Sequence, residues 1–207
     1  MEPSDRFAIT LGEAIYSLRA IRRIKPDPIP DDDLLDVLDA ARQAPNGGNS
    51  QPWHFLAIKD EQLRRQFGEL YREAWWAKRA DQGIHGPDDI DPTNRTTLSA
   101  MKFAEEIGSV PAIVLVCATE QGAGAMGSVI PAVQNMLLAA RALGVGGTIT
   151  TLHPSVDDRV KELLDIPEGI QIVYAIPLGY PKGNFGPVTR KPLSEICSID
   201  NWDNKIS

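Results

Sequence analysis

The sequence contains few of the residues that build metal centres and disulfide scaffolds. Its 207 residues include two cysteines, Cys117 and Cys197, and three scattered histidines, His54, His85 and His153. Zinc sites need Cys and His at short fixed spacings, and small extracellular domains need even sets of paired cysteines, but neither pattern is present. We therefore expect no metal site, no disulfide, and a reducing, cytoplasmic compartment.

Long apolar runs and an excess of positive charge are also missing. No continuous apolar run approaches the ~20 residues of a membrane span, and no basic segment precedes an apolar one near the start, so we expect neither anchor nor signal peptide. The formal net charge of −7 argues against a nucleic-acid surface, which needs a basic face. A hydrophobic content of 43% over residues 1–207 is typical of one globular domain.

One stretch, residues 44–53, concentrates residue types that suit a ligand. Its glycines, Gly47 and Gly48, allow positive φ and close backbone approach. Its neutral amides, Asn46, Asn49 and Gln51, suit a polar heterocycle or a ribityl chain better than they suit a metal. An ordinary helix-to-strand turn with Asx hydrogen bonds is the alternative interpretation.

A basic cluster stands near the start of this acidic chain. Arg19, Arg22, Arg23 and Lys25 place four cations within seven residues, just before Pro26. Guanidinium groups match phosphate geometry in a bidentate way, so the cluster indicates a pocket for a small anion. A solvated surface cluster is the alternative.

Helical and extended patterns alternate along the chain. Thr10 begins a first helix with a capping box, and three aspartates at residues 31–33 begin a second. Asp60 is expected to cap a helix that runs to Ala74, and Ser155 is expected to cap a short later helix. Residues 53–58, 110–118 and 170–180 predict strands.

The middle of the chain is less regular. Residues 121–127 predict a flexible loop before a long helix that begins at Ser128, with Pro131 in its first turn. Residues 71–107 predict a helix and loop excursion over the active site. The glycines at 144–147 follow a helix instead of opening one, which excludes a Rossmann phosphate loop.

Four stretches in order resemble the FMN-dependent nitroreductase family: residues 19–30, 44–53, 134–144 and 190–193, with Asn46 where the family has Ser. The resemblance implies an α+β fold, a three-layer sandwich with a central, mainly antiparallel mixed sheet flanked by helices. It also implies an intertwined homodimer with two FMN sites at the interface and a C-terminal arm at about residues 183–207.

The same resemblance implies the residues of the site. Phosphate contacts fall to Arg19 and Arg22 from one side and Arg190 from the other, and Thr148, Ile149 and Thr150 lie against the isoalloxazine. The full implied cofactor set is Arg19, Ala20, Arg22, Arg23, Pro45, Asn46, Gly47, Asn49, Gln51, Gln134, Thr148, Ile149, Thr150 and Arg190. Tyr71, Trp75 and Trp76 are candidates to stack on an aromatic substrate, or alternatively to pack in a dimer interface.

The activity implied by the resemblance is ping-pong hydride transfer from NADH or NADPH through flavin N5 to an electron-poor acceptor such as a nitroaromatic or quinone. No side chain is assigned as acid or base, because the cofactor supplies the chemistry. Three alternatives stay open: a non-catalytic FMN-binding or storage protein, a family member with a specialised substrate or a deazaflavin donor, and a helical interaction module without cofactor.

Overall fold

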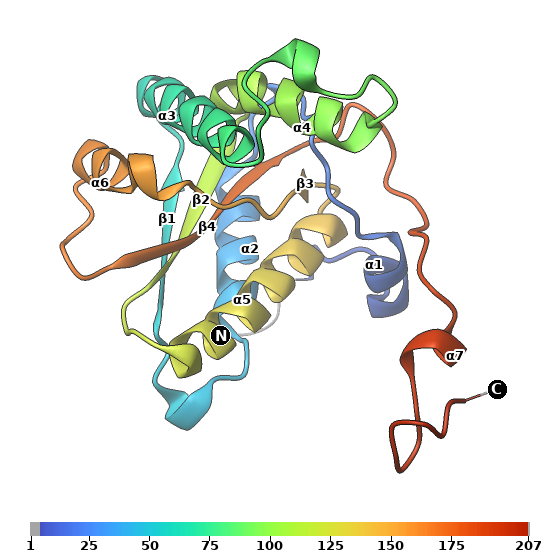
Figure 1. Ribbon diagram of the computed structural model, residues 1–207. Helices are drawn as coiled ribbons and strands as arrows, with labels where there is room; N and C mark the ends of the chain where they lie inside the picture. The colour runs from blue at the N-terminus through green and yellow to red at the C-terminus, as the bar shows by residue number, and fades with distance from the viewer. Residues whose placement is uncertain (1–4, 207) are drawn as a thin grey trace.

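A four-stranded antiparallel sheet, in the order β1-β2-β4-β3, forms the middle layer of the computed structural model, which describes residues 5–206 (Figure 1). The strands are β1 Trp53–Ile58, β2 Ala112–Ala118, β3 Gly146–Gly147 and β4 Gln171–Gly179. The three strand pairings are antiparallel. The expected α+β sandwich is therefore confirmed.

Helices cover both faces of the sheet. On one face lie α3 (Glu61–Ala80), α4 (Arg95–Glu106) and α6 (Pro154–Leu163); on the other lie α2 (Asp31–Arg42) and α5 (Ala123–Ala142). The short helices are α1 (Leu11–Ser17), η1 (Gly47–Asn49), η2 (Pro87–Asp89), η3 (Ile107–Ser109) and α7 (Leu193–Ile196). Because both faces are covered, every residue of β2 is buried.

Two predicted helix starts have the expected chemistry and a third differs. The Thr10 hydroxyl accepts from the Glu13 amide, and the Asp60 carboxylate accepts from the Leu63 amide at 2.8 Å. Helix α6 begins at Pro154, two residues earlier than a cap at Ser155 predicts, because the His153 ring accepts from the Ser155 amide and caps the helix instead.

The predicted flexible loop at residues 121–127 is wrong, because α5 begins at Ala123 and takes up most of it. Pro131 consequently lies inside the helix, past its first turn. Packing explains the difference: Ala125, Ser128 and Val129 are buried, and tertiary contacts outweigh the poor helix propensity of glycine.

Helix α5 is also long and apolar enough, by length and composition, to cross a membrane, although the chain has no continuous apolar run of that length. Half of the stretch is buried inside the fold. It packs along α2 and against β2, as the core helix of a sandwich does.

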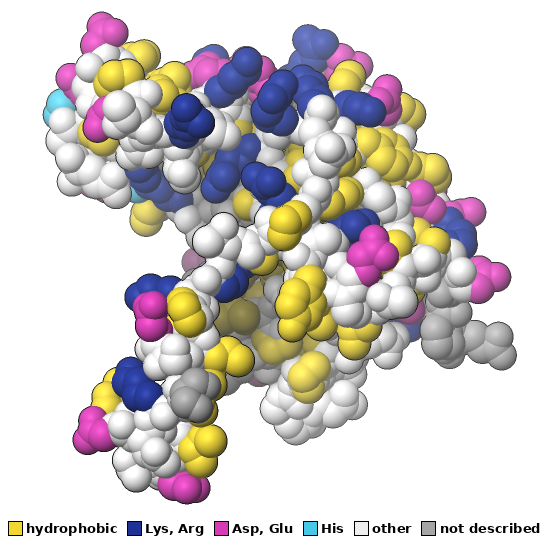
Figure 2. Space-filling view, turned by 90° about the vertical axis from the view of Figure 1, so that its right-hand side faces the viewer, with side chains coloured by type: hydrophobic (Ala, Val, Ile, Leu, Met, Phe, Trp, Pro, Cys, Tyr) yellow, Lys and Arg dark blue, Asp and Glu magenta, His cyan; other side chains and the backbone are white. Residues whose placement is uncertain are grey.

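The C-terminal arm leaves the body of the fold after β4 and bears α7 near its end (Figure 1). Leu193, Ile196, Ile199 and Trp202 are exposed along it, Trp202 to 85%. Figure 2 shows a hollow between this arm and the body, with Lys and Arg side chains gathered on the body above the hollow.

Candidate functional site

A cavity of about 150 Å³ lies between α3 and residues 148–151. We call residues 148–151 the cavity segment. The cavity unites residues that are far apart in the sequence. Its lining consists of Arg22, Tyr71, Trp75, Lys78, Arg79, Ala100, Phe103, Thr148, Ile149, Thr150 and Thr151. Predicted cofactor residues and predicted substrate residues therefore meet in one place.

Arg22 reaches the cavity because the backbone around it is held against the sheet. The Ile21 amide donates to the Gly147 carbonyl at 2.8 Å, and the Lys182 amide donates to the Arg23 carbonyl at 2.8 Å. Ile21 is buried, and its neighbour Arg22 lines the cavity. The basic cluster is thus divided: Arg22 enters the site, whereas Arg19 and Arg23 are exposed.

The glycines before the cavity segment allow close packing. A Cβ at Gly146 would lie 2.7 Å from the Ile21 side chain, and one at Gly147 would lie 2.8 Å from the Pro177 carbonyl oxygen. Real Cβ atoms do not approach so closely, so both positions need glycine. Their role is to bring residues 18–25 and β4 together.

Three hydrogen bonds, made by Tyr71 and Lys78, tie α3 to the cavity segment. The Tyr71 hydroxyl and the Thr150 hydroxyl share a hydrogen bond of 2.5 Å. The Lys78 ammonium donates to the Thr151 hydroxyl at 2.6 Å and also to the Thr151 carbonyl. The segment is thereby fixed between the helix and the sheet, where Thr150 pairs with Ala175 of β4.

Burial and positive charge both act on the titratable groups of the cavity. Burial raises the pKa of Tyr71 above its ordinary value, against the Thr150 hydrogen bond and the charges of Arg22 and Arg79. Burial, with a smaller contribution from the neighbouring Arg79 charge, lowers the pKa of Lys78. The phenol is therefore neutral near pH 7 and lies within the electrostatic reach of two guanidinium groups.

Residues 45–51, which we call the signature loop, form a second candidate surface elsewhere. The Gly47 amide lies 3.4 Å from the Ser128 hydroxyl, in the early turns of α5. Gly48, Asn49 and Gln51 all have positive φ, and residues 47–51 are exposed. The Oδ1 atom of the Asn46 side chain accepts from the Gln51 backbone amide at 2.9 Å, so this side chain closes the loop in which it lies.

The cavity and the signature loop lie on opposite faces of the sheet. The cavity is on the face covered by α3 and α4, and the loop rests on α5, which covers the other face (Figure 1). The sheet therefore lies between the two surfaces within a single chain. The residues attributed to one FMN site are therefore separated into two groups in each chain.

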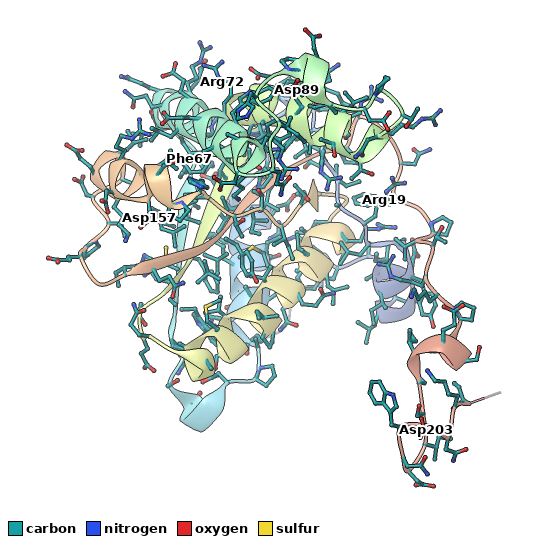
Figure 3. The ribbon with its side chains drawn as sticks, viewed as in Figure 1. Arg19, Phe67, Arg72, Asp89, Asp157 and Asp203 are labelled. Carbon is teal, nitrogen blue, oxygen red and sulfur yellow. The ribbon has the colours of Figure 1, made fainter. Side chains whose placement is uncertain are left out.

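The remaining implied site residues do not line the cavity. Arg19 lies on the segment that follows α1, on the side of the fold away from α6 and Asp157 (Figure 3). Gln134 is exposed on α5, and the exposed Arg190 donates to the Thr189 carbonyl at 2.9 Å. Trp76 contacts the edge of Trp75 with ring centroids 4.8 Å apart and is not a lining residue. Ala20 is exposed.

Sequence reasoning missed Lys78, Arg79 and Thr151. Lys78 and Arg79 lie three and four residues after Trp75, on the same face of the helix, and Thr151 follows Thr150 directly. Their spacing from predicted residues was the signal that could have found them. A larger cleft of 580 Å³ on the outer side of α3, between Glu61 and Ser109, contains none of the predicted residues. Across residues 5–206, no group of three or more His, Cys, Asp or Glu side chains could hold a metal ion.

Comparison with known proteins identifies the family. The model of the nitroreductase family matches residues 15–180. The chain belongs to the nitroreductase family. A protein of Archaeoglobus fulgidus, provisionally named NADH dehydrogenase/NAD(P)H nitroreductase, is a family relative that is 30% identical over 176 residues, or 81% of this chain and 83% of the relative.

Two solved structures share the nitroreductase fold. Oxidized iodotyrosine deiodinase bound to FMN and 3-iodo-L-tyrosine aligns with a TM-score of 0.75 and 23% identity, over 93% of this chain and 100% of that one. An FMN-dependent nitroreductase from Mycobacterium smegmatis in complex with NADPH aligns with a TM-score of 0.73 and 21% identity, over 92% and 97%. The comparisons confirm the predicted family, fold and enzyme class, an oxidoreductase.

Proposed function

We propose that this chain is an NAD(P)H-dependent oxidoreductase that binds FMN and reduces an electron-poor acceptor such as a nitroaromatic or a quinone. The observation that best supports this proposal is that Arg22, Thr148, Ile149 and Thr150 line the same cavity. A bound FMN would supply the redox chemistry, namely hydride transfer from the nicotinamide and reduction of the acceptor.

The residues present fit such a cofactor. None of the described lining residues is acidic, and Arg22 is one of them, so the cavity favours an electron-rich or anionic group. Ile149, 48% exposed, offers an apolar wall, and the hydroxyl groups of Thr148 and Thr150 offer polar contacts beside it.

The cavity is too small to hold the cofactor alone. Ligand pockets measure roughly 300–1,000 Å³, and this one measures 150 Å³. We therefore propose a homodimer in which the signature loop of one subunit completes the cavity of the other. The exposed apolar residues of the arm, Leu193 to Trp202, are proposed to pack on the partner.

The protein's own part in the reaction is binding and orientation. Arg22 supplies positive charge at the cavity wall, and the Tyr71 to Thr150 hydrogen bond fixes the Thr150 hydroxyl. No side chain is assigned as acid or base. Because Cys117 and Cys197 are both free thiols, we also propose a cytoplasmic location.

The test is a spectrum of the purified protein before and after anaerobic addition of NADH or NADPH. We expect a flavin band that bleaches near stoichiometry with at least one of the two donors. A band that persists with both donors would indicate a storage role or a deazaflavin donor. A colourless protein that gains no flavin from added FMN would contradict the proposal.

A further inference from the structure

Arg79 is a cation in the cavity that has no carboxylate partner among residues 5–206. Its Nε atom is buried and has no hydrogen-bond partner. Its guanidinium carbon lies 5.3 Å from the centroid of the Trp75 ring, a cation–π contact that holds the side chain in place without neutralising it. A buried, unpaired donor on a charged group is costly, so its retention indicates a ligand.

Lys78 adds a second charge beside it. Its ammonium donates to the Thr151 hydroxyl and to the Thr151 carbonyl, which leaves one of its three donors unused in these contacts. The neighbouring carboxylate, Asp81, is held by His153 at 3.1 Å instead. Among the described residues, neither Lys78 nor Arg79 forms an ion pair with a carboxylate.

The charged edge of the cavity lies next to an aromatic wall. Tyr71 and Phe103 meet edge to face, with ring centroids 6.0 Å apart, and both line the cavity with Trp75. A flat aromatic body fits such a wall, and a carboxylate fits the cations at its edge. Arg22 belongs to a different element, the segment at residues 18–25, and is the cation that we assign to the cofactor.

We propose that Arg79 and Lys78 form an anion-binding subsite for the acceptor, and that the acceptor is an aromatic molecule with a carboxylate group. The inference rests on the proposed function, because it places the acceptor beside the flavin. The Arg79 guanidinium binds the carboxylate, and Lys78 adds a second charge-assisted hydrogen bond.

The test compares ligands that differ only in charge. Benzoate and benzamide are titrated into the oxidised holoenzyme, and their dissociation constants are read from the shift of the flavin spectrum. Reoxidation of the NAD(P)H-reduced enzyme is then followed with 4-nitrobenzoate and with 4-nitrobenzamide. The variants are Arg79→Gln, Arg79→Lys and Lys78→Gln. The matched control is Arg72→Gln on the same helix, where Arg72 pairs with Glu105 at 3.4 Å on the outer side.

We expect Arg79→Gln to weaken benzoate binding at least tenfold and to leave benzamide unchanged. The ratio of kcat/KM for 4-nitrobenzoate over 4-nitrobenzamide should fall by a similar factor, mainly through KM. Lys78→Gln should have a smaller effect of the same kind, Arg79→Lys should restore part of the preference, and Arg72→Gln should behave as the wild type.

Two sources of an anion other than the acceptor are tested in the same variants. A tenfold loss of FMN affinity in Arg79→Gln would assign the anion to the cofactor, and a loss confined to NADPH relative to NADH would assign it to the nucleotide phosphate. Either result, or an unchanged benzoate preference, would overturn the inference. Bleaching of the wild-type flavin by NAD(P)H would still support the proposed function in each case.

Discussion

The cavity segment and the signature loop contribute to the same proposed site, yet the fold supports them differently. The cavity segment is held from both sides, by Tyr71 and Lys78 of α3 and by β4, and Thr148 in it is only 4% exposed. The signature loop is exposed over residues 47–51, and its main side-chain bond, from Asn46 to the Gln51 amide, is internal.

The difference supports the proposed division of the site between two subunits. A rigid, buried half can fix the orientation of a ligand, whereas an exposed half with positive φ at Gly48, Asn49 and Gln51 presents its backbone to a surface outside its own chain. Because the halves lie on opposite faces of the sheet, a second copy of the chain is the proposed means of joining them.

The largest expected effect comes from a mixed dimer in which one subunit has a defective cavity and the other has a defective signature loop. One subunit has Arg22→Glu, which reverses the charge at the cavity wall, and the other has Gly47→Glu, which adds a carboxylate at an open position of the loop. Each variant alone should lose FMN, but a mixed dimer purified with two different tags should regain about one FMN per dimer, because one of its two sites is intact. Flavin absorbance relative to protein measures this. Folded mixed dimers without flavin would show that the halves are not shared between subunits.

Arg22 in the cavity and Arg190 on the C-terminal arm should each contribute more to FMN affinity than an exposed cation elsewhere. Arg22→Ala and Arg190→Ala should each cost ~1.5–3 kcal/mol, about ten- to a hundredfold in affinity, because each removes a charged phosphate contact. Fluorescence titration of the apoprotein with FMN measures it. Arg65→Ala, which breaks the exposed 2.5 Å pair with Glu61, is the control. Unchanged affinity in both site variants would refute the assignment of the phosphate contacts.

A pair of glycine substitutions tests how tightly each half is packed. Gly147→Ala should lower the free energy of unfolding by about 1–3 kcal/mol, because its Cβ would lie 2.8 Å from the Pro177 oxygen. Gly47→Ala should change it by less than about 0.5 kcal/mol, because nothing lies within 4 Å of that Cβ. Urea denaturation compares them, and equal losses would remove the distinction between the halves.

The smallest expected effects come from single hydrogen bonds. Tyr71→Phe should lower the free energy of unfolding by about 1 kcal/mol and Asn46→Ala by about 0.5 kcal/mol, because the Tyr71 bond is part-buried and the Asn46 bond is exposed.

The raised pKa of Tyr71 means that the folded state holds the phenol proton more tightly than the unfolded chain. The contribution of this proton to the free energy of unfolding is complete below the unfolded-state pKa of ~10 and is lost as the pH rises through the folded-state pKa. Above pH ~10, the free energy of unfolding should therefore fall less steeply in Tyr71→Phe than in the wild type. Thermal unfolding between neutral and alkaline pH checks both statements.

Signals in adjacent residues were sufficient to predict most of the helices and strands. The apolar run of β2 is buried on both faces, and Thr10 and Asp60 cap the helices that they were expected to cap, because these signals depend on a few adjacent residues. The predicted start of α5 at Ser128 was wrong because the glycines at residues 122–127 favour a loop locally. Burial of Ala125 and Val129 stabilises a helix there instead.

The sequence by itself determined the family, the alternation of helices and strands, and the two stretches that we propose contribute to the site. Only the tertiary structure decided which members of those stretches meet. It placed Arg22 rather than Arg19 in the cavity, added Lys78 and Arg79 from α3, and put the signature loop on the other face of the sheet. The physical reason is that these positions depend on contacts between elements remote in sequence, such as the Ile21 amide on the Gly147 carbonyl, for which no adjacent residue gives a signal.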